Sequence, residues 1–519
     1  MRNRFMGHNL CRGRRDRSPP RAAYSLVVDV EILGGRAGAP SGFQFVVIRR
    51  SMISGPCGSS GFRCCGRLRL VNAEELETIG DRITDRACGD EQIEAVLAWS
   101  RDAEVRVHQG EVEHYVDATS VGVGVRVVRH GRQGLSWTGL LDDDALSQCI
   151  DDARDNAEFG SHDEHVGLAE PDGVAVSEVD LYDPRIESVT AEQRISLAAE
   201  LERILLAADD RMVGVESADY ADSRSVMSIV TTTGIRRSSV ESSAYLGTWA
   251  LAAEDDDVTT GFGYSVGRSA ELLDPGSAAA EAVERCVAAF GARKVAGGRA
   301  TVILDPYVTS QFLGAVAELL SGEAAVRGRS PFARRLGEPV AAPSVTLYDD
   351  PLDPLAPTAS DVDGEGLACR RVPLISGGSL EGFLHNAYTA RVAGVVSTGS
   401  ASRPTHRSGP GVGPRSLRLA PGDGDLSDVL GRVGEGILVR EVSGMHSGVN
   451  PISGDLSVGI EGRIVRGGAP SQPIREMTIA STIPRMLLDV VDIGADLTRF
   501  PWESAGVTLA IADVTVSGT

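Results

Sequence analysis

The sequence lacks several features that would place a protein quickly in a functional class. Its 519 residues contain no uncharged apolar run of about 18 residues, so no transmembrane helix is expected. The basic first residues are not followed by the apolar stretch and cleavage site of a secretory signal. Neither G-x-x-x-x-G-K-[ST] nor H-E-x-x-H occurs, so the sequence does not suggest a P-loop nucleotide-binding protein or a zincin-type metallopeptidase. We therefore expect a cytoplasmic protein without a membrane partner.

A disulfide framework is missing as well. The chain has 8 cysteines, but none of them forms a C-x-x-C pair, and half of them fall in the first 70 residues. Scattered cysteines of this kind are typical of reduced thiols in a cytosolic protein.

Charge is distributed unevenly along the chain. Residues 1–70 hold 13 arginines against only Asp16, Asp29 and Glu31, although the whole chain has a net charge of −21. The acidic remainder would repel a phosphate backbone, so no nucleic-acid partner is expected. Residues 1–70 show no regular hydrophobic period. We interpret them as a basic extension that is either disordered or included by an incorrect choice of start codon. A basic targeting arm is the alternative.

From residue 71 onward the pattern is that of a folded α+β protein. Leu76, Ile79 and Ile83 share one face of a predicted helix, and period-2 strands with glycine turns follow it. Thr190 and Gln193 have the spacing of a capping box at the start of another helix. The segment "GSAAAEAVERCVAAFGARKV" predicts a further helix, ended by "AGG". We expect an N-terminal mixed α/β domain at 71–170 and a central α/β segment at 171–297 packed with it.

The remainder, 298–519, is predicted to be a β-rich C-terminal domain. It opens with "RATVILDP", a buried strand, and "YVTSQFLGAVAELLSG", a helix. Phe312, Val316 and Leu319 would form the core-facing side of that helix, and Gly314 and Ala315 would allow close contact with a neighbour. Strands and glycine- or proline-rich loops dominate after it, and 402–416 is expected to be a long exposed loop.

Several short patterns suggest chemistry but have simpler explanations. The segment "HDEH" at 162–165 could bind a metal, but a solvated turn is favoured. "SVGVGVRVV" contains Gly-x-Gly, which we interpret as a closely packed strand rather than a dinucleotide loop. His385 is expected to be a core or interface histidine. Arg391, nearby, is expected to anchor a loop by hydrogen bonds.

The segment "GMHSGVNPISGDLSVGIEGRIV", from Gly444 to Val465, combines turn residues with an alternating strand. Leu456, Val458 and Ile460 would face one side of that strand. His446 could polarise a carbonyl or line a pocket. The segment is either an ordinary connection leading into a β-hairpin or part of the rim of a functional site.

Four segments together resemble the TldD/PmbA family, often labelled modulators of DNA gyrase. They are "VRVVRHGRQGLSWTGLLDDDAL", "GSAAAEAVERCVAAFGARKV", "HNAYTARVAGVVSTGSASR" and "SGMHSGVNPISGDLSVGIEGRIVRGGAPSQPIREMTIAST". The last is the most specific, and the resemblance extends over 71–519. It implies a TldD/PmbA-like fold and a system of two subunits, in which a TldD-type metallopeptidase binds zinc through an H-E-x-x-x-H helix and a late cysteine.

This chain departs from that pattern where the zinc ligands would be. The family's motif helix corresponds to "YVTSQFLGAVAELLSG", with the His, Glu and His positions at Gly314, Ala315 and Leu319. No His or Cys occurs between Asp305 and Gly328, and no Cys follows Cys369. Zinc catalysis needs three protein ligands and an activated water. The resemblance is therefore to the PmbA/TldE type, with no catalytic residue, metal or cofactor expected in this chain.

The resemblance implies an accessory subunit that pairs with a zinc-containing TldD-type partner to degrade unfolded peptides or mature modified ones. His446, Asn450, Asp455 and His385 are the residues predicted to face substrate or partner. A homodimer remains an alternative assembly. The alternative functions are an autonomous hydrolase using His385 or His446, and a protein-binding modulator of a toxin or gyrase system.

Overall fold

The computed structural model describes residues 72–518. The basic extension predicted for 1–70 lies outside the described residues. Helices combine with antiparallel sheets, and the C-terminal part is rich in strands, which confirms the predicted α+β class. Within the described residues, no helix is long and apolar enough to cross a membrane.

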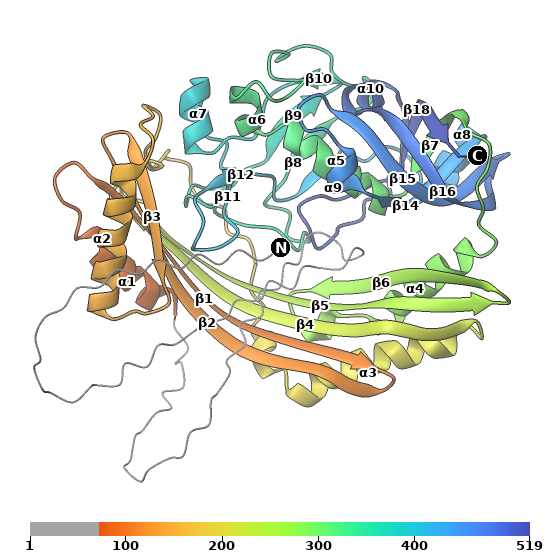
Figure 1. Ribbon diagram of the computed structural model, residues 1–519, viewed down its shortest axis with the longest axis horizontal. Coiled ribbons are helices and arrows are strands. Elements are labelled where there is room, and N and C mark those ends of the chain that lie inside the picture. Colours follow the sequence, from red (N-terminus) through yellow and green to blue (C-terminus); the bar gives the residue numbers. More distant parts are fainter. Residues whose placement is uncertain (1–71, 519) are drawn as a thin grey trace, which may run out of the picture. The chain divides into compact units, whose positions relative to one another are not determined.

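One large sheet forms the N-terminal half, and both predicted segments of that half contribute to it. Its order is β3-β2-β1-β4-β5-β6, and every neighbouring pair is antiparallel. The long strands are curved (Figure 1). The strands are β1 (Gln92–His108), β2 (Glu111–Arg129), β3 (Arg132–Thr138), β4 (Met212–Thr231), β5 (Arg236–Glu254) and β6 (Asp257–Gly267).

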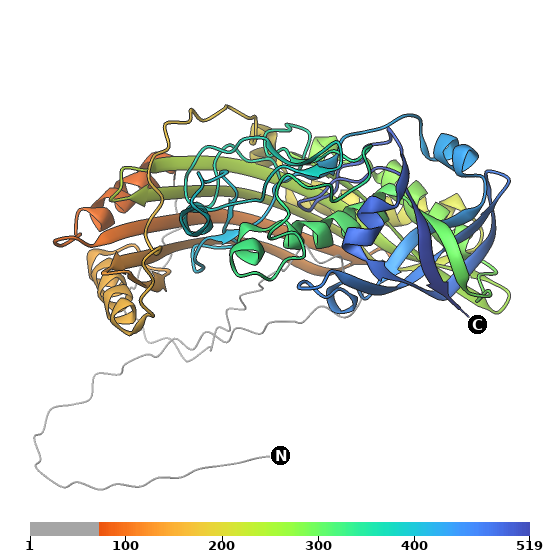
Figure 2. The ribbon, with the colours of Figure 1, turned by 90° about the horizontal axis from the view of Figure 1, so that it is seen from above.

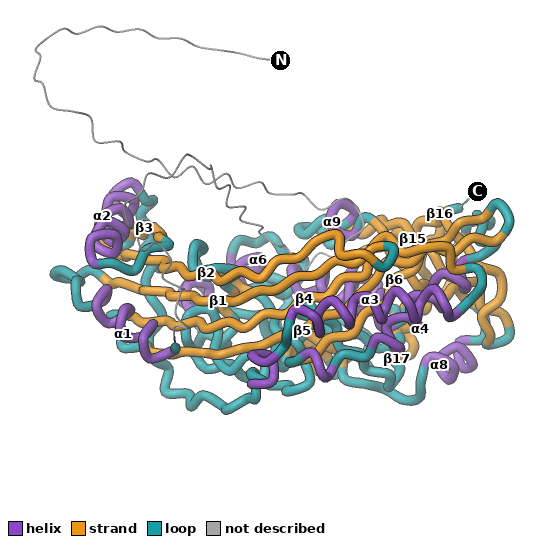
Figure 3. The backbone as a smooth tube through the Cα atoms, turned by 90° about the horizontal axis from the view of Figure 1, so that it is seen from below, coloured by secondary structure: helices purple, strands orange, loops and turns teal. Residues whose placement is uncertain are grey.

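Helices pack on one face of this sheet, and Figure 3 shows α3 and α4 along it. They are α1 (Ala73–Thr84), α2 (Asp143–Phe159), α3 (Ala191–Ala208) and α4 (Pro275–Ala289), with short 3-10 helices η1 (Pro184–Ser188) and η2 (Ala270–Leu272). Leu76 and Ile83 of α1 are fully buried, and Ile79 packs beside them, which confirms the predicted helix face. The capping box of Thr190 and Gln193 is also present.

The predicted end of α4 was wrong. The helix stops at Ala289 rather than at "AGG", seven residues further on. Its C-cap, Phe290, leaves the helical conformation with ψ 138°, and Gly291 follows in a left-handed conformation, φ +71°. Glycine tolerates this conformation because it has no Cβ.

A second six-stranded sheet organises the C-terminal half, in the order β16-β15-β14-β7-β18-β17. A further pairing of β16 with β18 closes five of these strands on themselves. Only β7 and β14 run parallel in this sheet. The strands are β7 (Gly298–Leu304), β14 (Gly436–Ser443), β15 (Asp455–Arg466), β16 (Ala469–Thr482), β17 (Val490–Ile493) and β18 (Leu509–Ser517).

Shorter elements surround this sheet. A four-stranded sheet has the order β10-β9-β8-β13, and β11 pairs with β12. The strands are β8 (Leu347–Asp349), β9 (Val372–Ser376), β10 (Ser379–Leu380), β11 (Ala401–Ser402), β12 (Gly411–Val412) and β13 (Leu417–Leu419). The helices are α5 (Pro306–Leu319), α6 (Gly322–Val326), α7 (Ala387–Ala393), α8 (Leu426–Val433), α9 (Met445–Gly448) and α10 (Ile483–Leu488).

The segment between β11 and β13 does not form the exposed loop that was predicted for 402–416. It lies over the N-terminal sheet (Figure 2), with His406 against two glycines of β2. A Cβ added to Gly122 would lie 2.1 Å from His406 Nε2, and one added to Gly124 would lie 1.7 Å from the His406 carbonyl oxygen. These glycines therefore serve close packing, as predicted for "SVGVGVRVV".

Candidate functional site

Helix α5 is the element on which the sequence prediction centres. Asp305 caps it by accepting a hydrogen bond from the Val308 N–H at 2.8 Å, and Pro306 occupies its first position. Phe312, Val316 and Leu319 are at most 3% exposed, which confirms the predicted core-facing side. The helix therefore has one face committed to the large C-terminal core.

The three positions at which zinc ligands would be expected on α5 carry little chemistry. Gly314 is exposed, and a Cβ added to it would meet no atom within 4 Å. The expectation that Gly314 permits close helix contact is therefore wrong. Ala315 is half-buried against the core, and Leu319 is fully buried. None of these three side chains has a lone pair to offer a metal or a proton.

His385 lies just beyond the C-terminal end of α5. The Gly322 N–H donates to the Leu384 carbonyl at 2.7 Å, and a Cβ added to Gly322 would lie 2.3 Å from His385 Nδ1. His385 is 6% exposed, its Nδ1 lies 3.1 Å from Thr389 Oγ1, and burial lowers its pKa. It is thus a buried core histidine that packs against the start of α6.

The Gly444–Val465 segment reaches the same end of α5. Gly454 has φ +76°, and a Cβ added there would lie 2.9 Å from Pro484 Cδ and 3.5 Å from Leu319 Cδ1. On β15, Leu456, Val458 and Ile460 are buried, as predicted for that strand. The turn is therefore pressed between α5 and α10, and its glycine is required there.

The polar residues of this segment face solvent. His446, Asn450 and Asp455 are all exposed. Asn450 Oδ1 accepts from the Ile452 N–H at 2.9 Å, and Asp455 accepts from Ser453 Oγ at 2.6 Å. The structure thus brings the turn at Gly454 and His385 to one end of α5, whereas the side chains of Asn450 and Asp455 make local hydrogen bonds within their own turn.

A buried carboxyl at the other end of α5 was not foreseen as part of a site. Asp305 is 4% exposed, and burial raises its pKa to about 6 despite the guanidinium of Arg440, whose Nε lies 3.2 Å from Asp305 Oδ2. Glu441, on the next strand β14, also has its pKa raised by burial and by Glu461. The aspartate before "PYVTSQF" could be recognised from sequence as a helix cap, but its partly buried partner Arg440 could not.

Aromatic side chains join this end of α5 to the N-terminal sheet. Phe262 of β6 lies 4.8 Å from Tyr307 of α5, measured between ring centroids. Tyr264, also of β6, lies 6.4 Å from Trp502, which stacks on Phe500 at 4.9 Å. The cluster was missed because its members come from three segments with no common pattern.

The short motif "GYSVG" at 263–267 has the G-x-S-x-G spacing of serine hydrolases. It lies within β6 rather than at a strand-to-helix turn. Ser265 Oγ accepts from the Asp274 N–H at 2.9 Å. Its placement does not form the exposed nucleophile turn that such a hydrolase needs.

Buried charges connect the sheet to the loops of the C-terminal half. Glu94 is 1% exposed and accepts from Arg126 Nε at 2.9 Å and from Arg403 Nη2 at 2.8 Å. Glu365, also 1% exposed, accepts from the Ala387 N–H at 2.8 Å. Burial and the neighbouring Asp363 raise the pKa of Glu365 to about 7. This cluster fixes the start of α7 against β1 and β2.

The "HDEH" segment adds a second connection. Tyr388 donates to Asp163 Oδ2 at 2.8 Å, and Arg391 donates to the carbonyls of His165, Gly167 and Leu168 at 2.7–3.1 Å. The prediction that Arg391 anchors a loop is confirmed. Within the described residues, no group of three His, Cys, Asp or Glu side chains could hold a metal ion.

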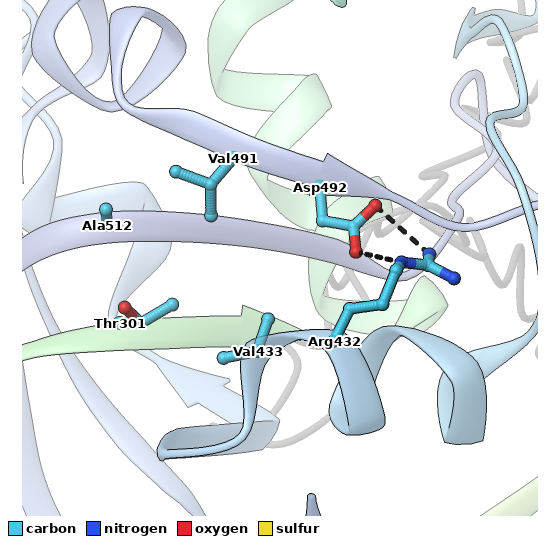
Figure 4. A pocket seen from close by; sticks show the side chains of 6 residues that line it. All are labelled: Thr301, Arg432, Val433, Val491, Asp492 and Ala512. Carbon is cyan, nitrogen blue, oxygen red and sulfur yellow. Dashed lines mark hydrogen bonds and ion pairs between the residues drawn. The ribbon is translucent and has the colours of Figure 1, made fainter.

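A shallow hollow of about 350 Å³ lies on the C-terminal sheet, away from these residues (Figure 4). An ion pair crosses one side of it, from Arg432 Nε to Asp492 Oδ2 at 2.6 Å. Val433 and Val491 complete its apolar side. It contains none of the residues predicted for a site.

Three models of one family match consecutive parts of the chain. They describe PmbA/TldA metallopeptidase domain 1 at 93–157, the central domain at 184–290 and the C-terminal domain at 297–518. Together they cover well over half of the sequence. The chain belongs to the TldD/PmbA family.

Relatives of both family types are similar to it. Metalloprotease PmbA of Escherichia coli O157:H7 is 26% identical over 409 residues, covering 78% of this chain and 87% of the relative. A metalloprotease TldD homologue of Haemophilus influenzae is 24% identical over 426 residues, covering 77% and 87%.

Solved structures of the TldD/PmbA family share the fold. A Thermotoga maritima protein that carries the label of a DNA gyrase modulator has a TM-score of 0.78 and 25% identity, covering 85% of this chain and 100% of its own. TldE from Thermococcus kodakarensis has a TM-score of 0.76 and 22% identity, covering 86% and 100%. The latter likeness shows the fold alone.

The family includes metallopeptidases, so the fit of a zinc ion to α5 can be tested on the residues present. Zinc sites use Cys, His, Asp or Glu ligands in a closed geometry. The positions expected to match the family's motif carry Gly314, Ala315 and Leu319, and Leu319 is buried in the core. The residues of α5 therefore do not fit a zinc ion.

Proposed function

We propose that this chain is a PmbA/TldE-like, non-catalytic subunit that pairs with a TldD-type metallopeptidase in the cytoplasm. The complex would degrade unfolded peptides or mature modified ones. The zinc ion would belong to the partner, and this chain would contribute to the chamber in which the peptide is held.

The observation that carries the proposal is the composition and burial of α5. At the family's motif positions, an exposed glycine, a half-buried alanine and a fully buried leucine replace two imidazoles and a carboxylate. Restoring ligands there would require an imidazole in the place of Leu319, inside the C-terminal core. The helix is therefore built for packing, while its surroundings keep the family fold.

The test is reconstitution of peptide cleavage with a TldD-type partner. The partner is assayed on an unfolded protein such as reduced casein, with and without this chain, and the two are passed together over a sizing column. We expect co-elution and cleavage that requires both chains. The matched control is the same mixture with the partner's H-E-x-x-x-H glutamate replaced by glutamine, which should co-elute without cleaving.

Two results would contradict the proposal. The first is cleavage by the partner at the same rate whether or not this chain is present. The second is cleavage by the mixture that survives the partner's Glu→Gln replacement, since the activity would then belong to this chain.

A further inference from the structure

A small pocket lies where three segments of the chain meet, and none of its lining residues belongs to α5 or to the turn at Gly454. The segments are the linker between α2 and η1, the β4–β5 hairpin and the loop before β9, which contribute residues from 171–174, 234–237 and 366–368. Its volume is about 230 Å³, below the roughly 300 Å³ at which pockets for drug-sized ligands begin. The space therefore suits a ligand about the size of one amino-acid residue.

One side of the pocket is apolar. Ile235, Leu367 and Ala368 line it, and each of them is at most 4% exposed. Gly366 has φ +80°, and a Cβ added to it would lie 2.6 Å from Ile235 Cγ2. Glycine at this position therefore lets the loop approach the hairpin closely. An apolar side chain that enters the pocket would be removed from water against this side, which favours binding.

Hydrogen bonds fix the walls of the pocket. Thr233 Oγ1 donates to the Ala169 carbonyl at 2.7 Å, which joins the hairpin to the linker. Asp172 accepts from Arg370 Nη1 at 2.9 Å and from the Val174 N–H at 3.0 Å. The one carboxylate that lines the pocket is thus neutralised by an arginine of its own chain. Walls that are already formed reduce the entropy that a ligand must lose on binding.

Arg237 also lines the pocket, and it has no carboxylate partner among the described residues. Its Nη1 donates to the Arg236 carbonyl at 2.9 Å, and its guanidinium makes no other hydrogen bond or ion pair within 72–518. Arg236, its neighbour on β5, lies on the opposite face of the strand and pairs with Glu77 and Asp81 of α1. The remaining N–H groups of Arg237 are therefore available to a ligand.

We propose that this pocket binds a free α-carboxylate together with the apolar side chain beside it, as they occur at the C-terminal residue of a peptide or in a small acylated amino acid. The Arg237 guanidinium would donate to both oxygens of the carboxylate, a geometry that arginine favours. The apolar side chain would pack against Ile235, Leu367 and Ala368. A phosphate fits less well, because it would bring about two negative charges to one arginine in a pocket that also contains the Asp172 carboxylate.

Saturation-transfer NMR of the full chain with N-acetyl-L-leucine tests this chemistry. We expect saturation of the leucine methyl groups and a binding curve on titration. N-acetyl-L-leucinamide keeps the side chain but lacks the charge, and N-acetylglycine keeps the charge but lacks the side chain. Each should bind at least about tenfold more weakly than N-acetyl-L-leucine, because one loses hydrogen bonds between charged groups and the other loses the burial of a leucine side chain.

Two arginines that are adjacent on β5 provide a matched pair of variants. Arg237→Gln should weaken the binding of N-acetyl-L-leucine at least about tenfold, since it removes the cation that would hold the carboxylate. Arg236→Gln is the control and should leave the affinity unchanged, because its side chain lies on the opposite face. Val174→Asp, at a position that is 41% exposed, should also weaken binding by adding a negative charge to the pocket. Circular dichroism checks that all three variants remain folded.

The peptide N-acetyl-Ala-Ala-Leu separates the two sources of this chemistry. Tighter binding of the peptide than of N-acetyl-L-leucine would support the proposal and assign the pocket to chain ends. Weaker binding of the peptide, with N-acetyl-L-leucine still bound, would support the proposal and assign the pocket to small carboxylic acids.

Three outcomes would overturn the proposal. They are the absence of saturation transfer to N-acetyl-L-leucine, equal binding of this acid and its amide, and equal affinities of the Arg236→Gln and Arg237→Gln variants. The experiment uses the chain purified without a TldD-type partner and changes no residue of α5. Its result is therefore independent of the proposed function.

Discussion

At the scale of single residues, the charged side chains buried between the N-terminal sheet and the C-terminal loops make the stability of the fold depend on pH. Glu94 is satisfied by two arginines, whereas Glu365 has its nearest guanidinium, Arg126, at 3.9 Å. Burial raises the pKa of both Asp363 and Glu365, and the neighbouring Asp363 raises that of Glu365 further, to about 7. Asp363 accepts hydrogen bonds from three backbone N–H groups, which favour its charged form, so Glu365 is the carboxyl expected to hold the proton.

Replacing Glu365 with glutamine should stabilise the protein above neutral pH. The folded pKa, about 7, exceeds the ordinary value of 4.5, so the stability contributed by the protonated acid is present below pH 4.5 and lost as pH rises through 7. An amide mimics the protonated acid at every pH. We expect the gain in unfolding free energy to grow by about 2–3 kcal/mol between pH 5 and pH 8. Urea unfolding at both pH values measures it.

The exposed Glu381, replaced by glutamine, is the control and should show no such growth. A Glu365→Gln variant whose stability relative to wild type is the same at pH 5 and pH 8 would contradict the assignment of the proton to Glu365.

The contact of His406 with β2 leads to a second prediction. Gly124→Ala would place a methyl group on the His406 carbonyl, and neither backbone can yield without moving the whole segment. We expect a loss of about 2–3 kcal/mol in unfolding free energy. Gly298→Ala, where an added Cβ meets nothing, should change it by less than about 0.5 kcal/mol. Equal effects of the two substitutions would refute the close contact.

At the scale of elements, helix α5 shows which structural features can be predicted from sequence and which cannot. Its core face follows from helical spacing, so Phe312, Val316 and Leu319 could be chosen correctly. The role of Gly314 could not, because spacing does not show whether a neighbour lies opposite a glycine. Likewise, the pairing of Asp305 with Arg440 joins residues 135 positions apart, which no local pattern indicates.

Two substitutions on α5 test whether Gly314 is free of close contacts and whether Phe312 packs in the core. Gly314→Ala should raise the unfolding free energy by about 0.5–1 kcal/mol, since alanine favours a helix and the added Cβ meets no atom. Phe312→Ala should lower it by about 3–5 kcal/mol by leaving a cavity in the core. Thermal and urea unfolding of both variants measure the changes. A destabilised Gly314→Ala would restore the close-contact interpretation.

At the scale of the whole molecule, the family and the α+β class were accessible from sequence because glycine turns and strand periods are local. The way in which the halves join was not. The junction combines an aromatic cluster between β6 and α5, the Glu94 ion pairs and the His406 contact, and each links distant segments. The loop at 402–416 was predicted to be exposed because its composition resembles that of solvated loops. Its contact with β2 joins segments far apart in the sequence, which composition does not show.

The central claim is that this chain has the family fold but lacks, on α5, the side chains that could bind a catalytic zinc ion. The most direct test is to purify this chain alone, measure its zinc content by mass spectrometry, and assay chelator-sensitive cleavage of reduced casein. The account predicts far less than one zinc per chain and no cleavage that a chelator removes. One zinc per chain together with chelator-sensitive cleavage would contradict it, because a complete metal site would then exist in this chain.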